Sequence, residues 1–396
     1  MNDIAGKKIL LGVTGGIAAY KAAELVRLLK KSNVDVNVVL TDSAKEFISP
    51  VTLQALSGNR VHTSMWDQSI PNGMPHIELS RQCDFILIAP ATADFISKVA
   101  NGQADDLLST LCLARDCPLI IAPAMNKQMW ENPSTQRNIA TLIADGIKLI
   151  GPDAGEQACG ELGSGRMSEP ESIFNEIVSW LQPQLLTGKN VVVTAGPTYE
   201  AIDAVRGITN ASSGKMGYAV AQAAVEAGAN VTLISGKTAL AAPAKASLVS
   251  VVSAQDMYEA VMSQLEQMDI FISVAAVADY RVKNRSEHKI KKSDDKLNIE
   301  FVENPDILKS VASRKKPPFC VGFAAESQNV EDYAKKKRIE KAIPLIAANV
   351  VTEALDSDQN SLLLIDEHGT HRLATSSKIE QARSLIKHIS ELMKTN

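Results

Sequence analysis

Residues 6–31, GKKILLGVTGGIAAYKAAELVRLLKK, decide the fold. A β-rich apolar run ends in Gly15-Gly16, and a helical pattern follows directly. The same order returns at 188–198, GKNVVVTAGPT, and each copy leads through a helical pattern to a further strand, at 34–40 and 230–234. The sequence therefore predicts an α/β protein with two doubly wound domains, each a mostly parallel sheet covered by helices.

Further apolar runs extend this alternation through both halves. In the first half we expect strands at 9–13, 34–40, 85–89 and 119–122, with helices at 17–31, 95–100, 133–145 and from Pro170 to about Leu186. In the second half we expect strands at 191–194, 231–235, 270–275 and 321–324, with helices at 216–227, 254–267 and 330–342. We place the boundary at Thr187-Gly188, giving domains 1–188 and 189–396.

Composition narrows the class of protein. A chain of 396 residues exceeds the length at which one core keeps growing, which also favours two domains. We expect a cytoplasmic protein with no membrane anchor, because no apolar run is long enough to span a bilayer and residues 1–8 do not resemble a signal peptide. The net charge of -4 disfavours general binding to nucleic acid. The odd number of cysteines argues against a disulfide framework or zinc site and leaves room for a working thiol: Cys83, Cys112, Cys117, Cys159 and Cys320.

The loop PAMNKQMW, residues 123–130, follows the apolar run at 119–122. It places a carboxamide, two thioethers and an indole at the carboxyl end of a strand, where open α/β folds bind ligands. Met125, Met129 and Trp130 could also be core packing, with Asn126 as a turn residue. Both interpretations are open on these eight residues alone.

Other groups follow the remaining strand ends. Gly15 and Gly16 stand where free amide groups at a helix start can hold a phosphate, but the G-x-G-x-x-G spacing and the acidic residue of a dinucleotide site are missing. Thr41 and Ser43 suit a mononucleotide phosphate instead, although either could be only a helix cap. Residues 89–94, APATAD, follow the third strand, and His76 lies in a segment that we expect to be an irregular loop because of its prolines and glycine.

With GGIAAYK, His76, PATAD, PAMNKQMW and a Cys159 segment in this order, the first half resembles the flavin-dependent cysteine decarboxylases. With the second half included, the chain resembles the bacterial bifunctional phosphopantothenoylcysteine decarboxylase/phosphopantothenate-cysteine ligases of coenzyme A synthesis. The resemblance implies a flavodoxin-like or Rossmann-like FMN-dependent decarboxylase domain, then a Rossmann-like CTP-dependent ligase domain. In that family the cysteinyl thiol is oxidised by FMN to a thioaldehyde, which lets the α-carboxylate leave.

By this resemblance His76 and Asn126 stand beside the flavin and the substrate carboxylate, and Met129 shapes the substrate pocket, with Trp130 left as packing. Family members form trimers or multiples of trimers, a dodecamer among them, so His76 is expected to act across a subunit interface. Cys159 is the expected proton donor, on a mobile flap that the glycines of GEQACGELGSGRM indicate. The implied FMN contacts are Gly15, Gly16, Ile17, Thr41, Ser43, Thr92, Ala93, Asp94, Phe95 and Ala124.

The second half carries the segments AGPT and NASSGKMG, residues 195–198 and 210–217, which by themselves are weak evidence for a nucleotide fold. A lysine-rich stretch at 281–296 lacks periodicity and is expected to be a long loop. Asp279 with Lys289 and its neighbours suits Mg²⁺ and a nucleoside triphosphate, although a solvated loop would contain the same residues. Lys337 and Lys341, four apart, are expected to share one helix face.

The ligase resemblance implies that CTP activates the carboxylate of 4'-phosphopantothenate as an acyl-cytidylate, which the amine of cysteine then attacks. Asn210 and Lys289 would be catalytic, and Asp279 would hold Mg²⁺. The product, 4'-phosphopantothenoylcysteine, is the decarboxylase substrate. The implied contacts of CTP and substrate are Ala275, Ala276, Asp279, Lys289, Asn304, Pro305, Asp306, Ile307, Phe323, Lys337 and Lys341.

Two other functions are compatible with parts of the chain. Some proteins of the decarboxylase fold act through partners, so a flavin-binding regulatory protein is the alternative, but His76, Asn126 and Cys159 together favour turnover. A nicotinamide dehydrogenase is disfavoured by the missing dinucleotide fingerprint. One departure from the ligases is AANVV, residues 347–351, which lacks the acidic residue expected after the asparagine.

Overall fold

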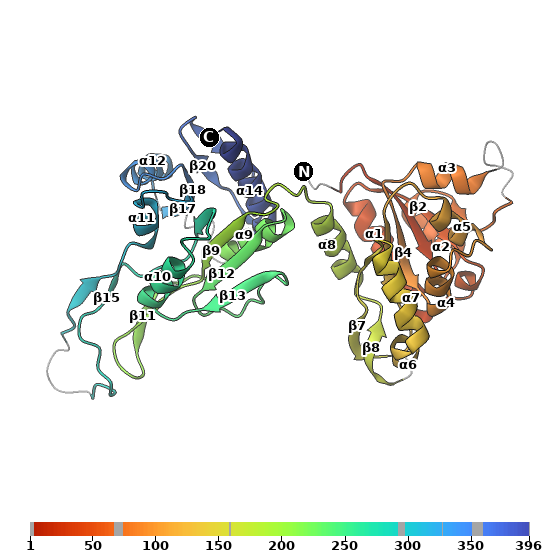
Figure 1. Ribbon diagram of the computed structural model, residues 1–396, viewed down its shortest axis with the longest axis horizontal. Helices are drawn as coiled ribbons and strands as arrows, with labels where there is room; N and C mark the ends of the chain where they lie inside the picture. Colours follow the sequence, from red (N-terminus) through yellow and green to blue (C-terminus); the bar gives the residue numbers. More distant parts are fainter. Residues whose placement is uncertain are drawn as a thin grey trace. The chain divides into compact units, whose positions relative to one another are not determined.

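The computed structural model describes residues 4–66, 74–157, 160–291, 298–326, 328–350 and 359–395. The chain divides into two compact units, Met1–Gln182 and Pro183–Asn396, which Figure 1 draws in red to olive and in green to blue. The division lies six residues before the boundary expected at 188, because 183–188 packs on the second unit. Leu186 is buried in that unit's core, and its amide donates to the carbonyl of Ala227 at 2.8 Å.

The first unit is built on one parallel sheet in the order β3-β2-β1-β4-β5-β6. This is the doubly wound order in which the connections diverge between the first and fourth strands. The elements follow as β1 (Lys8–Val13), η1 (Ile17–Ala19), α1 (Tyr20–Lys31), β2 (Asp35–Leu40), η2 (Ser43–Glu46), α2 (Pro50–Ser57), β3 (Val61–His62), α3 (Pro75–Arg81), β4 (Phe85–Ala91), α4 (Ala93–Ala100), α5 (Leu107–Ala114), β5 (Leu119–Pro123), α6 (Lys127–Glu131), α7 (Pro133–Ala144), β6 (Lys148–Leu149), β7 (Asp153–Glu156), β8 (Leu162–Arg166) and α8 (Pro170–Trp180).

Alternate residues of the central strands point to opposite faces, and each face has its own core. Ile9 and Leu11 of β1 lie in one buried cluster with residues of α1, α2 and α8. Leu10 of β1 lies in another, with residues of α3, α4, α5 and α7. The sheet is therefore covered on both faces, as the near-continuous apolar strands predicted.

The second unit repeats this plan and extends it. Its main sheet has the order β13-β12-β9-β14-β17-β18-β20-β21, in which the first six strands are parallel and β20 and β21 are antiparallel. The elements follow as β9 (Asn190–Ala195), β10 (Tyr199–Ala201), β11 (Gly207–Thr209), α9 (Lys215–Glu226), β12 (Asn230–Ser235), β13 (Ala246–Ser250), α10 (Ala254–Ser263), β14 (Ile270–Ser273), β15 (Tyr280–Val282), β16 (Phe301–Glu303), α11 (Ile307–Ala312), β17 (Phe319–Glu326), α12 (Val330–Glu340), β18 (Leu345–Val350), β19 (Gln359–Asn360), β20 (Leu363–Ile365), β21 (Thr370–Arg372), β22 (Ser376–Ser377) and α14 (Lys378–Thr395).

Helices also cover both faces of this sheet. Val191 and Val193 of β9 lie in one core with residues of α9 and α14, whereas Val192 lies in the other with residues of α10, α11 and α12. The predicted fold class, two doubly wound domains with mostly parallel sheets, is confirmed. In the described part of the chain we find no helix that is long and apolar enough to cross a membrane.

The predicted elements differ from the structure at several places, including the following two segments. The helix from Pro170 ends at Trp180 rather than near Leu186, since Pro183 follows shortly after and the chain moves to the second unit. The stretch 281–296 is not a loop throughout, because β15 (Tyr280–Val282) pairs with β16 in antiparallel register. Residues 292–297 lie outside the described residues.

A buried ion pair joins α9 to α14. Arg383 donates from Nε and Nη2 to the two carboxylate oxygens of Glu226, at 2.7 and 3.0 Å, and Gln222 donates to the same carboxylate. The side chain of Glu226 is only 3% exposed. A buried carboxylate of this kind is costly once its cation is removed.

We predict that Arg383→Met lowers the local stability of α9 and α14 by about 3–5 kcal/mol, because it leaves the Glu226 charge buried and unpaired. Hydrogen exchange of peptides from both helices measures this loss. The control is Lys336→Met, which removes an exposed pair with Glu340 and should cost at most about 1 kcal/mol. Adding Glu226→Gln to Arg383→Met should recover part of the loss. Unchanged exchange in Arg383→Met would contradict the prediction.

Candidate functional site

The first unit has a cavity of about 680 Å³ at the carboxyl ends of β1, β4 and β5. Three chain segments that are far apart in sequence meet around it: the loop after β1, the start of α4 and the loop 123–130. A fourth side is formed by the β7–β8 hairpin. Residues expected from the sequence that line the cavity are Gly15, Gly16, Ile17, Thr92, Ala124, Asn126 and Met129.

The glycine loop, Gly15-Gly16 after β1, packs closely against Ser43 at the start of η2. A Cβ atom on Gly15 would lie 2.5 Å from both Cβ and Oγ of Ser43, so only glycine permits this approach. The hydroxyls of Thr41 and Ser43 lie 3.2 Å apart, and Thr41 Oγ1 accepts the amide hydrogen of Ala44. Thr41 thus makes a local hydrogen bond in the turn that leads into η2, whose N-cap position is Asp42. Neither Thr41 nor Ser43 is among the residues that line the cavity.

A buried hydroxyl holds the ends of β1 and β4 together. Thr14, 2% exposed, donates from Oγ1 to the carbonyl of Pro90 at 2.9 Å and accepts the amide hydrogen of Thr92 at 3.0 Å. Thr92 in turn accepts from the amide of Phe95 and caps α4. Of the expected residues 92–95, only Thr92 lines the cavity, since the ring of Phe95 is buried in the core.

The loop 123–130 divides into two parts. Asn126 caps α6, its Oδ1 accepting the amide hydrogen of Met129 at 2.9 Å, and Met129 is 46% exposed toward the cavity. Trp130 packs against the core, as expected, and Met125 both packs there and lines the cavity. The two interpretations of this loop therefore apply to different residues in it.

The glycine-rich segment after β6 forms the β7–β8 hairpin, which packs against that loop. Met125 donates its amide hydrogen to the carbonyl of Gly165 at 2.9 Å, and a Cβ atom on Gly165 would lie 2.5 Å from the Met125 oxygen. The amide of Lys127 donates to Oε1 of Gln157. Cys159, the expected proton donor, lies outside the described residues.

His76 is the second residue of α3, so the expectation of an irregular loop around it was wrong. Pro75 occupies the first helical position, where its missing amide hydrogen and fixed φ favour a helix start instead of preventing one. His76 is half-buried and is not among the residues that line the cavity of its own chain.

The second unit has a cavity of about 480 Å³ at the carboxyl ends of β9, β14 and β17. The expected residues Asn210, Ala275, Ala276 and Phe323 line it. At its base, Gly196 and Gly214 have φ of +69° and +75°, and a Cβ atom on Gly214 would lie 3.3 Å from Cα of Gly196. Gly214 has no side chain to cap α9, and residues 214–217 at the start of that helix line the cavity.

Hydrogen bonds fix the segment 274–278 that borders this cavity. Thr194 Oγ1 accepts the amide hydrogens of Val274 and Ala275 at 3.2 and 3.3 Å, and Thr198 Oγ1 accepts that of Ala278 at 3.0 Å. The side-chain nitrogen Nδ2 of Asn210 donates to the carbonyl of Ala276 at 3.0 Å. Asn210 is therefore tied to the wall of the cavity that it lines.

The remaining expected ligase residues lie on neighbouring segments and do not line the cavity. Two of these residues are hydrogen-bonded to each other: the backbone amide of Asn304 donates to the carbonyl of Asp279 at 2.8 Å. Asp306 caps α11 and forms an ion pair with Lys341 at 3.1 Å. Lys341 is the C-cap of α12, which holds Lys337, and its amide donates to the carbonyl of Lys337 at 3.1 Å, so the two lysines lie one helical turn apart. Pro305 and Ile307 flank the Asp306 cap, and Ile307 is buried in the core.

The segment of Lys289 is held by a buried carboxylate. Asp203 accepts hydrogen bonds from the guanidinium of Arg206 and from the amides of Val205, Arg206 and Ile290. The hydrogen bond from Arg206, together with those from the amides, holds the pKa of Asp203 well below its usual range. Lys289 itself is exposed, next to the tethered Ile290.

Comparison with known proteins covers both units. Residues 2–182 match the family described as Flavoprotein, and residues 186–393 match the DNA/pantothenate metabolism flavoprotein C-terminal domain. The chain is 51% identical to the coenzyme A biosynthesis bifunctional protein CoaBC of Haemophilus influenzae, over 98% of both chains. It is 48% identical to that of Escherichia coli K12, over 95% of both, and 44% identical to that of Bacillus subtilis, over 98% of both.

The chain belongs to the CoaBC family of bifunctional coenzyme A biosynthesis proteins. The resemblance seen in the sequence is confirmed, as is the overall function expected from it. The protein is a bifunctional enzyme of coenzyme A biosynthesis, a phosphopantothenoylcysteine decarboxylase and phosphopantothenate-cysteine ligase.

Several residues at the two cavities were missed in the sequence. Lys21, 7% exposed, lines the first cavity and donates to Glu169 at 2.8 Å, and this hydrogen bond lowers the pKa of Glu169. The sequence did hold a signal for Lys21. It lies four residues before Leu25, and residues four apart share one helix face, so Lys21 is on the face of α1 that packs against the sheet. In the second unit Asn349 and Lys378 line the cavity. Asn349 was not expected there, because the segment AANVV at 347–351 lacks the acidic residue that the ligases carry after the asparagine.

Proposed function

We propose that the cavity of the first unit holds FMN together with the cysteinyl end of 4'-phosphopantothenoylcysteine. One observation carries this proposal: the glycine loop, the start of α4 and the loop 123–130 contribute residues to a single cavity. A volume of about 680 Å³ is within the range of cofactor sites. The match of residues 2–182 to the Flavoprotein family supports a flavin in this unit.

The residues around the cavity suit the parts of FMN. Ile17, Tyr20 and Met129 leave large apolar surfaces exposed there, at 65%, 63% and 46%, which suits a flat aromatic ring system. The glycine loop leaves amide groups without side chains beside them, and the start of α4 adds others, which suits a phosphate. By the family resemblance, Thr41 and Ser43 would contribute hydroxyls from beside the lining residue Gly15, and Ala93, Asp94 and Phe95 would contribute backbone groups from beside the lining residue Thr92.

When bound, FMN supplies the two-electron acceptor that the substrate thiol requires before the neighbouring carboxylate can leave. The protein's part is to bind and orient that carboxylate. Asn126 suits this role because its Oδ1 is engaged by Met129, which leaves the amide nitrogen as the donor group of the side chain. Met129 and Ala124 would shape the space around the reacting end of the substrate.

We place His76 and Cys159 in the same site on the strength of the family resemblance. His76 would reach the cavity of a neighbouring subunit in a trimer or a multiple of trimers. Cys159 would donate the proton that completes the reaction. The β7–β8 hairpin, on either side of Cys159 in sequence, packs on the loop of Asn126, which supports a role for this hairpin as a cover over the substrate.

For the second unit we propose CTP-dependent coupling of 4'-phosphopantothenate to cysteine in the cavity lined by Asn210. The start of α9, with Lys215 and Lys378 in the cavity lining, supports the binding of phosphate groups. Asp279, exposed after the segment 274–278, would hold Mg²⁺ against phosphate oxygens. Ala275, Ala276 and Phe323 would border the bound nucleotide, with Asn304, Asp306, Lys337 and Lys341 on adjoining segments.

Activation is needed because a carboxylate is a poor electrophile. Lys289 would stabilise negative charge that develops on acyl and phosphoryl oxygens, and Asp203 would hold the segment of Lys289 in position. Nδ2 of Asn210 carries two hydrogens: one donates to Ala276, and the other would orient the acyl group. The coupled product is the substrate of the first unit, so one chain would carry out two successive steps.

We predict that Asn126→Asp lowers carbon dioxide release from 4'-phosphopantothenoylcysteine on the order of 10²-fold or more, because an aspartate keeps the cap on α6 but repels the substrate carboxylate and cannot donate to it. The matched control is Asn132→Asp. Asn132 caps α7 through a hydrogen bond from Ser134 at 2.9 Å, and it does not line the cavity. Equal activity in the two variants would remove Asn126 from the reaction.

We predict that Asn210→Asp lowers coupling of cysteine to 4'-phosphopantothenate on the order of 10²-fold, since the donor to Ala276 is lost and a negative charge enters the cavity. The release of CMP measures this step. Decarboxylation of supplied 4'-phosphopantothenoylcysteine by the same variant is the internal control and should be unchanged. Undiminished CMP release would show that Asn210 takes no part.

A further inference from the structure

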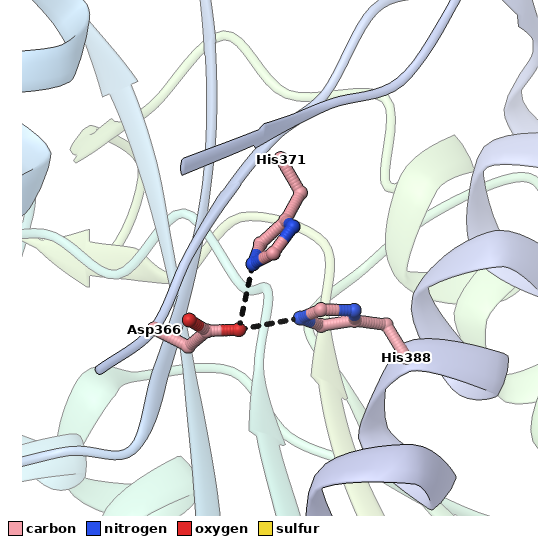
Figure 2. A group of neighbouring side chains, drawn as sticks. All are labelled: Asp366, His371 and His388. Atoms are coloured by element: carbon pink, nitrogen blue, oxygen red, sulfur yellow. Dashed lines mark hydrogen bonds and ion pairs between the residues drawn. The ribbon is translucent and has the colours of Figure 1, made fainter. Parts of the chain in front are cut away.

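Within the described residues, one group outside both cavities brings three possible metal ligands together: Asp366, His371 and His388 (Figure 2). Asp366 directly follows β20, and His371 lies in β21, the other strand of the same hairpin. His388 lies on α14, which packs on α9. No residue of this group lines either cavity described above.

The three side chains converge on one point. Oδ2 of Asp366 lies 2.8 Å from Nε2 of His388 and 3.1 Å from Nε2 of His371, and the three ligand atoms all lie within 4.8 Å of one another. Tetrahedral zinc, with bonds of about 2.0–2.1 Å, places its ligand atoms about 3.3 Å apart. Small movements of the two imidazoles would therefore open space for an ion between the three atoms.

The carboxylate is already oriented by the hairpin turn. Asp366 is only 4% exposed, and its Oδ1 accepts the amide hydrogens of His368 at 2.7 Å and Gly369 at 3.0 Å. Oδ2 is thereby directed at the two imidazoles. Outer hydrogen bonds of this kind, which fix the orientation of a ligand, accompany metal sites in proteins.

Solvent reaches the group from one side. The side chain of His388 is 17% exposed and that of His371 is 42% exposed. An ion could enter from this side and keep a water molecule as its fourth ligand. Two imidazoles and one carboxylate suit Zn²⁺ and similar ions, whereas Mg²⁺ and Ca²⁺ prefer oxygen ligands.

We propose that Asp366, His371 and His388 bind one divalent first-row transition metal ion, with Zn²⁺ as the preferred occupant. The ion would join the β20–β21 hairpin to α14. Both elements are connected to the ligase cavity. Lys378, the first residue of α14, lines that cavity, and β20 pairs with β18, whose Asn349 also lines it. The ion would hold the hairpin and the helix together, and its site is distinct from the Mg²⁺ site proposed at Asp279.

The test is a titration of the metal-free full-length protein with Zn²⁺ against a chelating dye, together with thermal unfolding. Wild-type protein should bind one equivalent that His371→Ala and His388→Ala both lose, and Zn²⁺ should raise the unfolding temperature of wild type more than that of either variant. The variants keep all cysteines, so the zinc that they bind measures the background, which is subtracted from the zinc bound by wild type. Mg²⁺ should not displace this equivalent, and any shift of the unfolding temperature by Mg²⁺ should be the same in wild type and in both variants.

The matched control is His368→Ala. His368 is a neighbouring exposed histidine whose imidazole is not part of the group, so this variant should bind zinc as wild type does. His371→Ala is the more informative of the two ligand variants because His371 is exposed and its removal leaves the core intact. The proposal is overturned if wild type binds no additional equivalent relative to His371→Ala and His388→Ala, or if His368→Ala loses the same equivalent.

Discussion

Parallel strand pairing at the centre of each sheet is the constraint on which the rest of the structure depends. In the order 3-2-1-4-5-6 the connections leave β1 and β4 toward opposite faces, which opens a crevice at their carboxyl ends. The Thr14 hydroxyl bridges this point in the first unit, and Thr194 and Thr198 do so between β9 and the segment after β14 in the second. Both cavities lie at these positions, so the two proposed sites share one architecture.

The features that could be predicted from the sequence are the local ones. An apolar run ending in glycine and followed by a helical pattern predicted both sheets. Asn126 of PAMNKQMW and Asn210 of NASSGKMG, which were singled out in the sequence, do line cavities. The roles of Thr14 and Lys21 could not be predicted. Their partners Thr92 and Glu169 lie 78 and 148 residues away, and no local pattern reports a contact at that separation.

Non-local pairing also explains the errors. Strand β15 was read as loop because its partner β16 lies about twenty residues on, and a three-residue strand has too little periodicity of its own. His76 was misplaced because Pro75 was taken as a helix breaker, although at the first helical position it favours a helix. The Asp366 group has no motif spacing, since its ligands come from a hairpin and a helix that meet only in the folded chain.

The central claim is that one chain carries out both the ligase and the decarboxylase steps in these two cavities. The most direct measurement is incubation of the purified, flavin-loaded protein with 4'-phosphopantothenate, cysteine and CTP, following CMP and carbon dioxide together. The account predicts release of both, with carbon dioxide appearing only after CMP and only when all three substrates are present. Release of neither product by a folded, flavin-loaded protein would contradict it.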